Sequence, residues 1–126
     1  MNNEQKITRG LIIRQPWIGR ILDGSKTWEM RSAPTKVRGR IALIEQGSGT
    51  IVGECCIVGC PQPSIPIERF TAWHQVYNRD LLKKWRHPWE LEQVKRYDKP
   101  IPYKHPQGAV VWVDLEKAGV DLSKTK

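Results

Sequence analysis

The chain has 126 residues, of which 39% are hydrophobic and 27% are charged. This length predicts one domain with one core, and no segment reaches the roughly 20 apolar residues that span a membrane. Lysine and arginine outnumber aspartate and glutamate by 21 to 13, a net charge of +8 that favours a polyanionic partner such as a nucleic acid. The polar start of the chain and the reduced thiols expected for Cys55, Cys56 and Cys60 predict a cytoplasmic protein.

The chain begins with the pattern of a buried strand followed by a short helix. Residues 10–14 contain a continuous apolar run, which is typical of a strand covered on both faces. Pro16 is well placed to open a helix, because the first helical position needs no amide donor. Gly24 predicts the end of that helix, which is about two turns long.

Residues 26–31 alternate in polarity and predict a second strand. The alternation turns Trp28 and Met30 toward the core. It turns three polar side chains to the other face, toward solvent or a cleft: Thr27, Glu29 and Arg31.

Two more strands are predicted at residues 39–45 and 50–60, joined by a glycine-rich turn. Three prolines between residues 61 and 66 then end the sheet. Spacings of three and four between apolar residues predict helix across 67–89, with a second helical stretch at 80–85.

The end of the chain predicts an extended segment at 99–102 and a last strand at 108–115. The whole chain, 1–126, is therefore expected to form a single domain with its core at about 8–115 and flexible tails at 1–7 and 116–126. The order of elements favours an α+β, mainly β fold. We expect a small mixed or antiparallel β-barrel with a short helix after the first strand and a helical insert before the last.

Basic and aromatic side chains concentrate between residues 14 and 40, where seven cations stand against two carboxylates. Trp17 and Trp28 lie among them, each as either a core residue or a stacking surface. Cations and aromatic rings together are what single-stranded RNA or an isolated base requires. The cations are Arg14, Arg20, Lys26, Arg31, Lys36, Arg38 and Arg40.

Lys26, Glu29 and Arg31 crowd a turn and the strand that leaves it. They are interpreted either as a structural ion pair or as a recognition site. In the second case the carboxylate accepts from a base amine while a cation holds a phosphate or polarises a carbonyl. Lys26 could also serve as a base if it is desolvated.

No motif for a metal or a cofactor is present, because the three histidines and three cysteines have no ligand spacing. We therefore expect no metal and no cofactor. A second basic region at residues 77–104 is interpreted as a solvated helical face or as a further phosphate-binding surface.

Several short motifs together resemble the ASCH domain family of the PUA-like superfamily. They are Ile-Arg-Gln-Pro-Trp at 13–17, Gly-Ser-Lys-Thr-Trp-Glu-Met-Arg at 24–31, Arg-Gly-Arg at 38–40, Ile-Val-Gly-Glu at 51–54 and Lys-Pro-Ile-Pro at 99–102, with Gly108 and Trp112 beyond. The resemblance implies a PUA-like β-barrel with a cleft beside the first helix and the second strand, and a role with RNA.

Some members of that family are small amidohydrolases that remove acetyl from N4-acetylcytidine, with a lysine, a threonine three residues later and a glutamate from the helical insert. Here Lys26 takes the lysine position and Glu29 the threonine position, and Glu68 is the candidate from the insert. Other members resemble metal-independent ribonucleases with a lysine-centred site, which Lys26 fits.

The sequence thus leads to three hypotheses. The first is a module that binds RNA, another single-stranded nucleic acid or a modified nucleoside in a basic cleft. Its expected ligand-binding residues are Arg14, Gln15, Trp17, Lys26, Thr27, Glu29, Arg31, Arg38 and Arg40. The second is a small hydrolase, either an amidohydrolase or a ribonuclease, in which Lys26 and Glu29 transfer protons. The third is a protein-interaction domain.

Overall fold

The computed structural model describes residues 6–122. Of the tails that the sequence predicts to be flexible, residues 1–5 and 123–126 lie outside the described part. The elements follow the chain in this order: β1 (Arg9–Ile13), α1 (Trp17–Leu22), β2 (Trp28–Arg31), β3 (Gly39–Glu45), β4 (Thr50–Gly59), the 3-10 helix η1 (Ile67–Phe70), α2 (Thr71–His74), α3 (Arg79–Lys84), β5 (His87–Pro102) and β6 (Trp112–Asp114).

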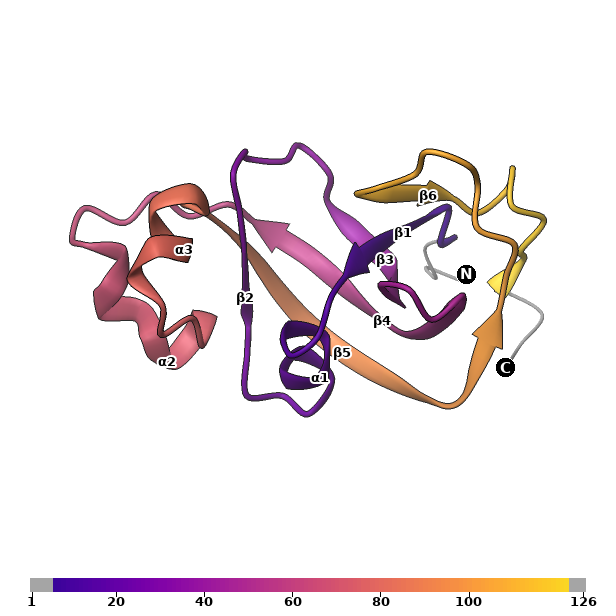
Figure 1. The fold of residues 1–126 in the computed structure, drawn as a ribbon, viewed down its shortest axis with the longest axis horizontal. Coiled ribbons are helices and arrows are strands. Elements are labelled where there is room, and N and C mark those ends of the chain that lie inside the picture. Colours follow the sequence, from indigo (N-terminus) through magenta and orange to yellow (C-terminus); the bar gives the residue numbers. More distant parts are fainter. Residues whose placement is uncertain (1–5, 123–126) are drawn as a thin grey trace, which may run out of the picture.

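All six of these strands belong to one mixed sheet in the order β2-β5-β4-β3-β1-β6. β1 pairs with β3 in parallel, and the other neighbouring strands pair antiparallel. The sheet curls into a half-barrel, and α1 covers its concave side (Figure 1). The predicted mainly β, barrel-like fold is confirmed, and β2 and β6 form its two edges.

The core fills the curl of the sheet beneath α1. Ile18 and Ile21 of α1 are fully buried against Leu11 of β1 and Leu43 of β3, a pair of residues that face each other in the sheet. The apolar face expected for the helix is therefore correct, and Gly24 ends the helix with a positive φ of 88°. This packing fixes α1 beside the residues that lead into β2.

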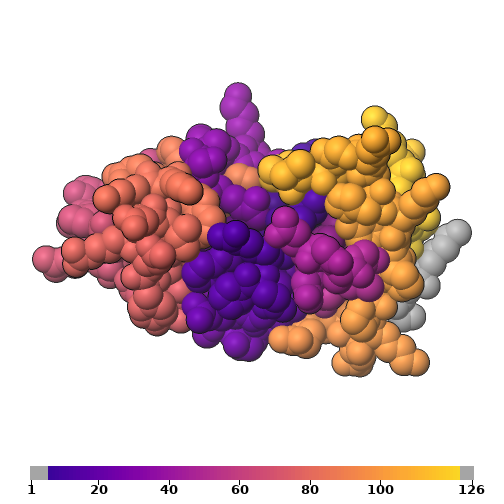
Figure 2. Space-filling view, in the orientation of Figure 1, coloured from indigo at the N-terminus to yellow at the C-terminus, as the bar shows by residue number. Residues whose placement is uncertain are grey.

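The helical insert between β4 and β5 stands at one end of the molecule, far from both termini (Figure 1). Figure 2 shows it as a lobe against the segment that contains α1. Its three short helices pack on the outer face of β2, where Trp28 and Met30 meet Ile67, Val76 and Leu82. Trp28 and Met30 are therefore buried as predicted, in a cluster of their own outside the barrel.

The prediction of helix through residue 89 is wrong, because β5 begins at His87 and runs for 16 residues. Trp89 and Leu91 are buried and Glu92 is exposed, so the segment follows the period of a strand. Pro88 does not break it. It lies opposite Met30 of β2, beyond the end of β4, where a residue without an amide hydrogen costs no ladder bond to β4.

The last strand is shorter than predicted, since β6 contains only Trp112–Asp114. Beyond it, Leu115 and Leu122 are buried against Ile12 and Val113, so the chain continues to contribute to the core up to the last described residue. Within residues 6–122 no helix combines the length and the apolar character that crossing a membrane requires.

Candidate ligand-binding site

A cavity of about 200 Å³ lies where the edge strand β2 approaches β1 and the loop before β6. Apolar, aromatic, cationic and carboxylate side chains all contribute to its wall. They come from two strands, two helix ends and three connections: Ile12, Arg14, Trp17, Glu29, Met30, Arg31, Gln46, Trp85, Val110 and Val111.

The side chain of Arg31 connects β2 to β1 across the half-barrel. Its guanidinium Nε donates to Oε2 of Glu29 at 2.9 Å, and a terminal guanidinium nitrogen donates to the carbonyl of Ile12 at 2.8 Å. The guanidinium also lies 5.5 Å from the ring centre of Trp89. Because Ile12 belongs to β1, one side chain links an edge strand to the opposite side of the curled sheet beside the cavity.

Glu29 presents a buried carboxylate to the cavity, with only 5% of the residue exposed. Its position opposite Trp89 in the β2–β5 ladder turns the side chain toward the inside of the barrel. Oε1 of Glu29 lies 3.7 Å from Nζ of Lys26, and Oε2 accepts from Arg31. The carboxylate is therefore flanked by two cations. Glu29 and Arg31, which the sequence places on the face toward solvent or a cleft, both line the cavity.

Lys26 lies behind the cavity rather than in its wall, and 1% of it is exposed. Its Nζ donates to the carbonyls of Trp28 at 2.7 Å and His74 at 2.5 Å. Glu29 is a third polar neighbour, at the 3.7 Å distance of an ion pair. Lys26 thereby ties α2 of the insert to β2.

Burial lowers the pKa of Lys26 from 10.5 to about 8, although the charge of Glu29 acts in the opposite direction. The desolvation that the sequence could not show is therefore present. His74 is also buried, and burial lowers its pKa as well. Its ring Nε2 lies 2.9 Å from the carbonyl of Ile67, and its Nδ1 accepts from the amide of Val76, so the neutral ring is held by the insert itself.

Two indole rings meet at the cavity. Trp17 of α1 and Trp85, just after α3, pack edge to face with centroids 6.0 Å apart. The guanidinium of Arg14, an exposed residue, lies 5.4 Å from the ring centre of Trp85. The buried Nε1 of Trp17 has no hydrogen-bond partner among the described residues. The wall therefore offers aromatic surface and a cation.

The structure brings four of the nine predicted ligand-binding residues to the cavity: Arg14, Trp17, Glu29 and Arg31. Gln15 is exposed and accepts from the amide of Gly19 at the start of α1. The backbone of Thr27 is bonded on both sides, to Trp73 and to Leu91.

The two predicted phosphate contacts, Arg38 and Arg40, lie away from the cavity wall. Arg38 donates to the carbonyls of Thr35 and Val37. Arg40 forms an ion pair with Glu54 on β4. Both arginines are thus engaged by the sheet and its connections.

Sequence reasoning missed Trp85, Gln46, Val110 and Val111 as parts of the cavity wall. The run of basic residues around Trp85 was visible as a possible second surface. Gln46 and the two valines carry no local signal, because their place depends on how β3 and the loop before β6 meet β1. Ile12 makes this contact directly by donating its amide hydrogen to the carbonyl of Val111 at 2.9 Å.

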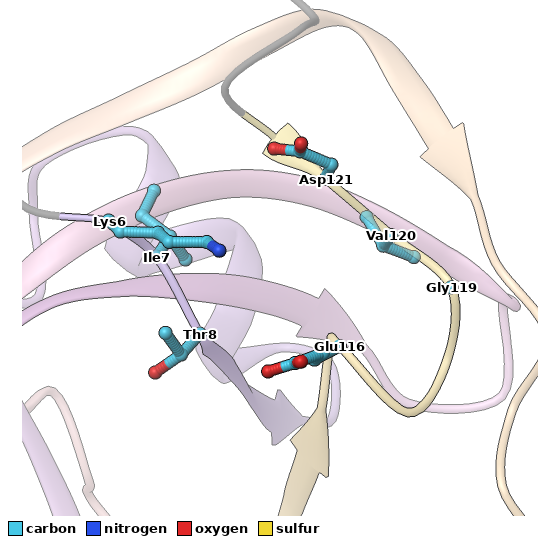
Figure 3. Close-up of a pocket in the computed structure, with 7 residues that line it drawn as sticks. All are labelled: Lys6, Ile7, Thr8, Glu116, Gly119, Val120 and Asp121. Atoms are coloured by element: carbon cyan, nitrogen blue, oxygen red, sulfur yellow. The ribbon is translucent and has the colours of Figure 1, made fainter.

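A second cavity, of about 220 Å³, lies beside the two ends of the described chain (Figure 3). It contains no aromatic side chain and none of the predicted site residues. The first cavity is the better candidate because it alone of the two combines rings with paired charges. Within the described residues, no three side chains of the metal-binding types come together.

Two comparisons, with a family profile and with solved structures, give consistent results. The profile of the ASCH domain matches residues 11–101. The structure is similar to the crystal structure of ASCH from Zymomonas mobilis, with a TM-score of 0.64 and 13% identity over 85% of this chain and 86% of that one. Ser-to-Ala and Tyr-to-Phe mutants of the Zymomonas mobilis protein also have TM-scores of 0.64, at 15% identity; each aligns with 87% of this chain and with 89% and 91% of its own. No curated protein sequence matches.

Proposed function

The chain belongs to the ASCH domain family, and from this premise we propose that it binds RNA or a modified nucleoside, with one base held in the cavity beside β2. One observation carries the proposal. The cavity places the rings of Trp17 and Trp85 beside a buried carboxylate, Glu29, with Arg14 and Arg31 at its wall. These are the groups that stack on a base, accept from its amine and attract its phosphate.

Each group has a distinct part in this proposal. The ring of Trp85 offers a stacking surface, and Glu29 keeps acceptor capacity beyond its bond to Arg31 for an exocyclic amine. Trp17 adds a second ring to the wall, packed edge to face against Trp85. Arg14 is exposed at the rim and is the cation for a phosphate.

The size of the cavity favours a single base. Its volume of about 200 Å³ is below the ~300–1,000 Å³ of sites that enclose drug-sized ligands. The ribose and phosphate would then remain outside, where the positive surface of a chain with a net charge of +8 attracts them.

Binding of a fluorescent single-stranded RNA of about twelve nucleotides, measured by anisotropy at increasing KCl, tests the proposal. We expect log affinity to fall linearly with log salt. Arg14→Ala should weaken binding and reduce the salt slope by about 0.7. Lys117→Ala removes an exposed charge that does not line the cavity and serves as the matched control. If neither RNA nor nucleosides bind at low salt, the proposal fails.

A hydrolase is the second candidate, and the desolvated amine of Lys26 is the observation that favours it. A lysine with a pKa of about 8 exchanges protons readily near neutral pH, and Glu29 connects it to the cavity. Binding is ranked first because the ammonium already has three polar neighbours and lies outside the wall.

The enzyme hypothesis is tested with N4-acetylcytidine and with labelled RNA in the presence of EDTA. A hydrolase should convert one of the two substrates, and Lys26→Met should abolish the conversion. No conversion by the wild-type protein, or equal conversion by Lys26→Met, excludes catalysis by this residue.

A further inference from the structure

Two large aromatic side chains are exposed on the helical insert, outside the cavity. Trp73 of α2 is 46% exposed, and Tyr77, which follows α2, is 71% exposed. Exposed apolar area of this kind at neighbouring positions marks an interaction surface rather than a core.

Trp73 is held in one orientation by the rings beneath it. It stacks on Trp28 with centroids 5.7 Å apart and an interplanar angle of 28°. Phe70 packs against both rings, at 5.1 Å from Trp73 and 5.0 Å from Trp28. Since Trp28 is buried on β2, the insert presents an indole whose position is set by the core of the domain.

Hydrogen bonds hold the segment between the two exposed rings in place. Arg20 of α1 donates to the carbonyl of Gln75 at 3.0 Å, and Lys26 donates to the carbonyl of His74 at 2.5 Å. The hydroxyl of Tyr77 donates to the side chain of Gln75 at 3.3 Å. A surface that is already ordered loses little conformational entropy when a partner binds.

The charges around these rings favour a polyanion. From residue 61 to residue 86 the exposed cations outnumber the exposed carboxylates five to two: Arg69, Arg79, Lys83, Lys84 and Arg86 against Glu68 and Asp80. Arg20 adds a further cation directly at the turn after Trp73. Rings for bases and cations for phosphates are the two elements of single-stranded nucleic acid binding.

We propose that Trp73 and Tyr77 form a stacking platform for single-stranded RNA, on which nucleotides next to the one in the cavity are held. The inference extends the proposed function and rests on it for the identity of the partner. Continuity supports it: the hydrophobic cluster that supports Trp73 also includes Trp17 and Trp85 of the cavity. The cavity and the exposed rings of the insert are therefore supported by one hydrophobic cluster.

Length-dependent binding tests the platform. Trp73→Leu keeps bulk over Trp28 but removes the ring, and Tyr77→Ala removes the second ring. Base stacking of about 1–3 kcal/mol per ring corresponds to a loss of about 5- to 150-fold in affinity for the RNA of about twelve nucleotides. Affinity for single nucleoside monophosphates, which fill only the cavity, should remain unchanged.

Controls separate stacking from misfolding. Trp73→Phe retains a ring and should keep most of the affinity. Ile65→Ala removes another exposed apolar side chain of the insert, 51% exposed and without a ring, and should bind like the wild type. Thermal unfolding of each variant shows whether the fold is kept. Unchanged oligomer affinity in both folded ring variants, Trp73→Leu and Tyr77→Ala, overturns the platform.

The outcome also distinguishes the platform from the cavity. If Trp85→Ala leaves the affinities for the oligomer and for nucleoside monophosphates unchanged while oligomer binding still depends on Trp73, the platform stands and the cavity proposal fails. If the oligomer does not bind at any salt concentration, both fail. Binding to vesicles that contain phosphatidylserine, lost in Trp73→Leu while RNA affinity is unaltered, assigns the surface to a membrane and overturns the RNA platform.

Discussion

The ammonium group of Lys26 lies 3.7 Å from the carboxylate of Glu29, and both residues are almost completely buried. The pair sits at the junction of three parts of the molecule. Lys26 bonds the carbonyl of His74 in the insert, and Glu29 bonds Arg31, which reaches the carbonyl of Ile12 in β1. A change of charge at either residue should therefore alter the stability of the fold and the electrostatics of the cavity together.

Lys26→Met should change how stability depends on pH. The pKa of Lys26 is about 8 in the folded protein and 10.5 when unperturbed, so the unfolded chain binds more protons between these values. The stability of the wild type therefore rises with pH across this window. Relative to Lys26→Met, the gain in free energy of unfolding from pH 7 to pH 10.5 should be on the order of 3 kcal/mol.

Urea denaturation of both proteins across this pH range measures the effect. Burial raises the pKa of Cys55 to about 12, which lowers stability at high pH, but this contribution is common to both proteins and cancels in the difference. Parallel stability curves for the two proteins would show that Lys26 is not desolvated.

Glu29→Gln should lower the pKa of Lys26 below its value in the wild type. The negative charge of Glu29 is what opposes the effect of burial on that lysine, and glutamine keeps the size and an acceptor while removing the charge. The titration of the Lys26 side chain followed by NMR measures the shift. Glu54→Gln is the control, since Glu54 pairs with Arg40 and Tyr97 instead.

Local patterns in the sequence were sufficient to predict the elements around this pair. The alternation at residues 26–31 places Trp28 and Glu29 on opposite faces, and the structure has them so. Glycine predicted the end of α1 and proline its start to within one residue, since Pro16 is the N-cap and the helix begins at Trp17. The same reasoning failed at the start of β5. The helical spacing of apolar residues was extended past Lys84, where α3 ends, although Trp89 and Leu91 follow the two-residue period of a strand.

The burial of the site residues could not be predicted, because it depends on contacts between segments that are distant in the sequence. Lys26 bonds a carbonyl 48 residues away, and that contact exists only after the insert has packed on β2. Trp85 reaches the cavity for the same reason. Side-chain type at positions 26–31 thus indicated the chemistry, whereas burial and partners required the tertiary structure.

Gly53→Ala should destabilise the domain by about 1–3 kcal/mol or more. A Cβ at Gly53 would lie 2.5 Å from the carbonyl oxygen of Lys95 on β5 and 2.8 Å from Cδ2 of Leu22 on α1. Gly59→Ala on the same strand is the control, because its Cβ would meet only Glu90, at 3.5 Å. Chemical denaturation of both variants measures the difference, and equal stabilities would contradict the close packing of α1 on β4.

Arg40→Ala should reduce RNA affinity less than Arg14→Ala, although the sequence places both in one basic region. Arg40 is held by Glu54; burial acts to raise the pKa of that carboxyl, but its bonds to Arg40 and Tyr97 outweigh burial and lower the pKa. Removing Arg40 should therefore mainly lower stability, whereas removing Arg14, which lines the cavity, should mainly lower RNA affinity. Anisotropy titrations and thermal unfolding of the two variants give both quantities. A larger loss of affinity in a folded Arg40→Ala protein would move the site to the outer face of the sheet.

Trp17→Phe and Trp89→Phe remove the same indole nitrogen from two different environments. Nε1 of Trp89 donates to the carbonyl of Ala33 at 2.9 Å, so its loss leaves a carbonyl without that donor. Nε1 of Trp17 is buried without a partner among the described residues, so Trp17→Phe relieves an unsatisfied donor. The cost in stability should be larger for Trp89→Phe by about 1–3 kcal/mol.

Ligand binding should respond in the opposite order. Trp17 lines the cavity, and Trp17→Phe offers a smaller ring to a bound base, so affinity should fall by about two- to tenfold with little change in thermal stability. Trp89 lies beneath Arg31 and outside the cavity wall, so a folded Trp89→Phe protein should bind nearly as the wild type does. Calorimetric titration with nucleoside monophosphates compares the two, and equal affinities would show that the indole of Trp17 does not contact the ligand.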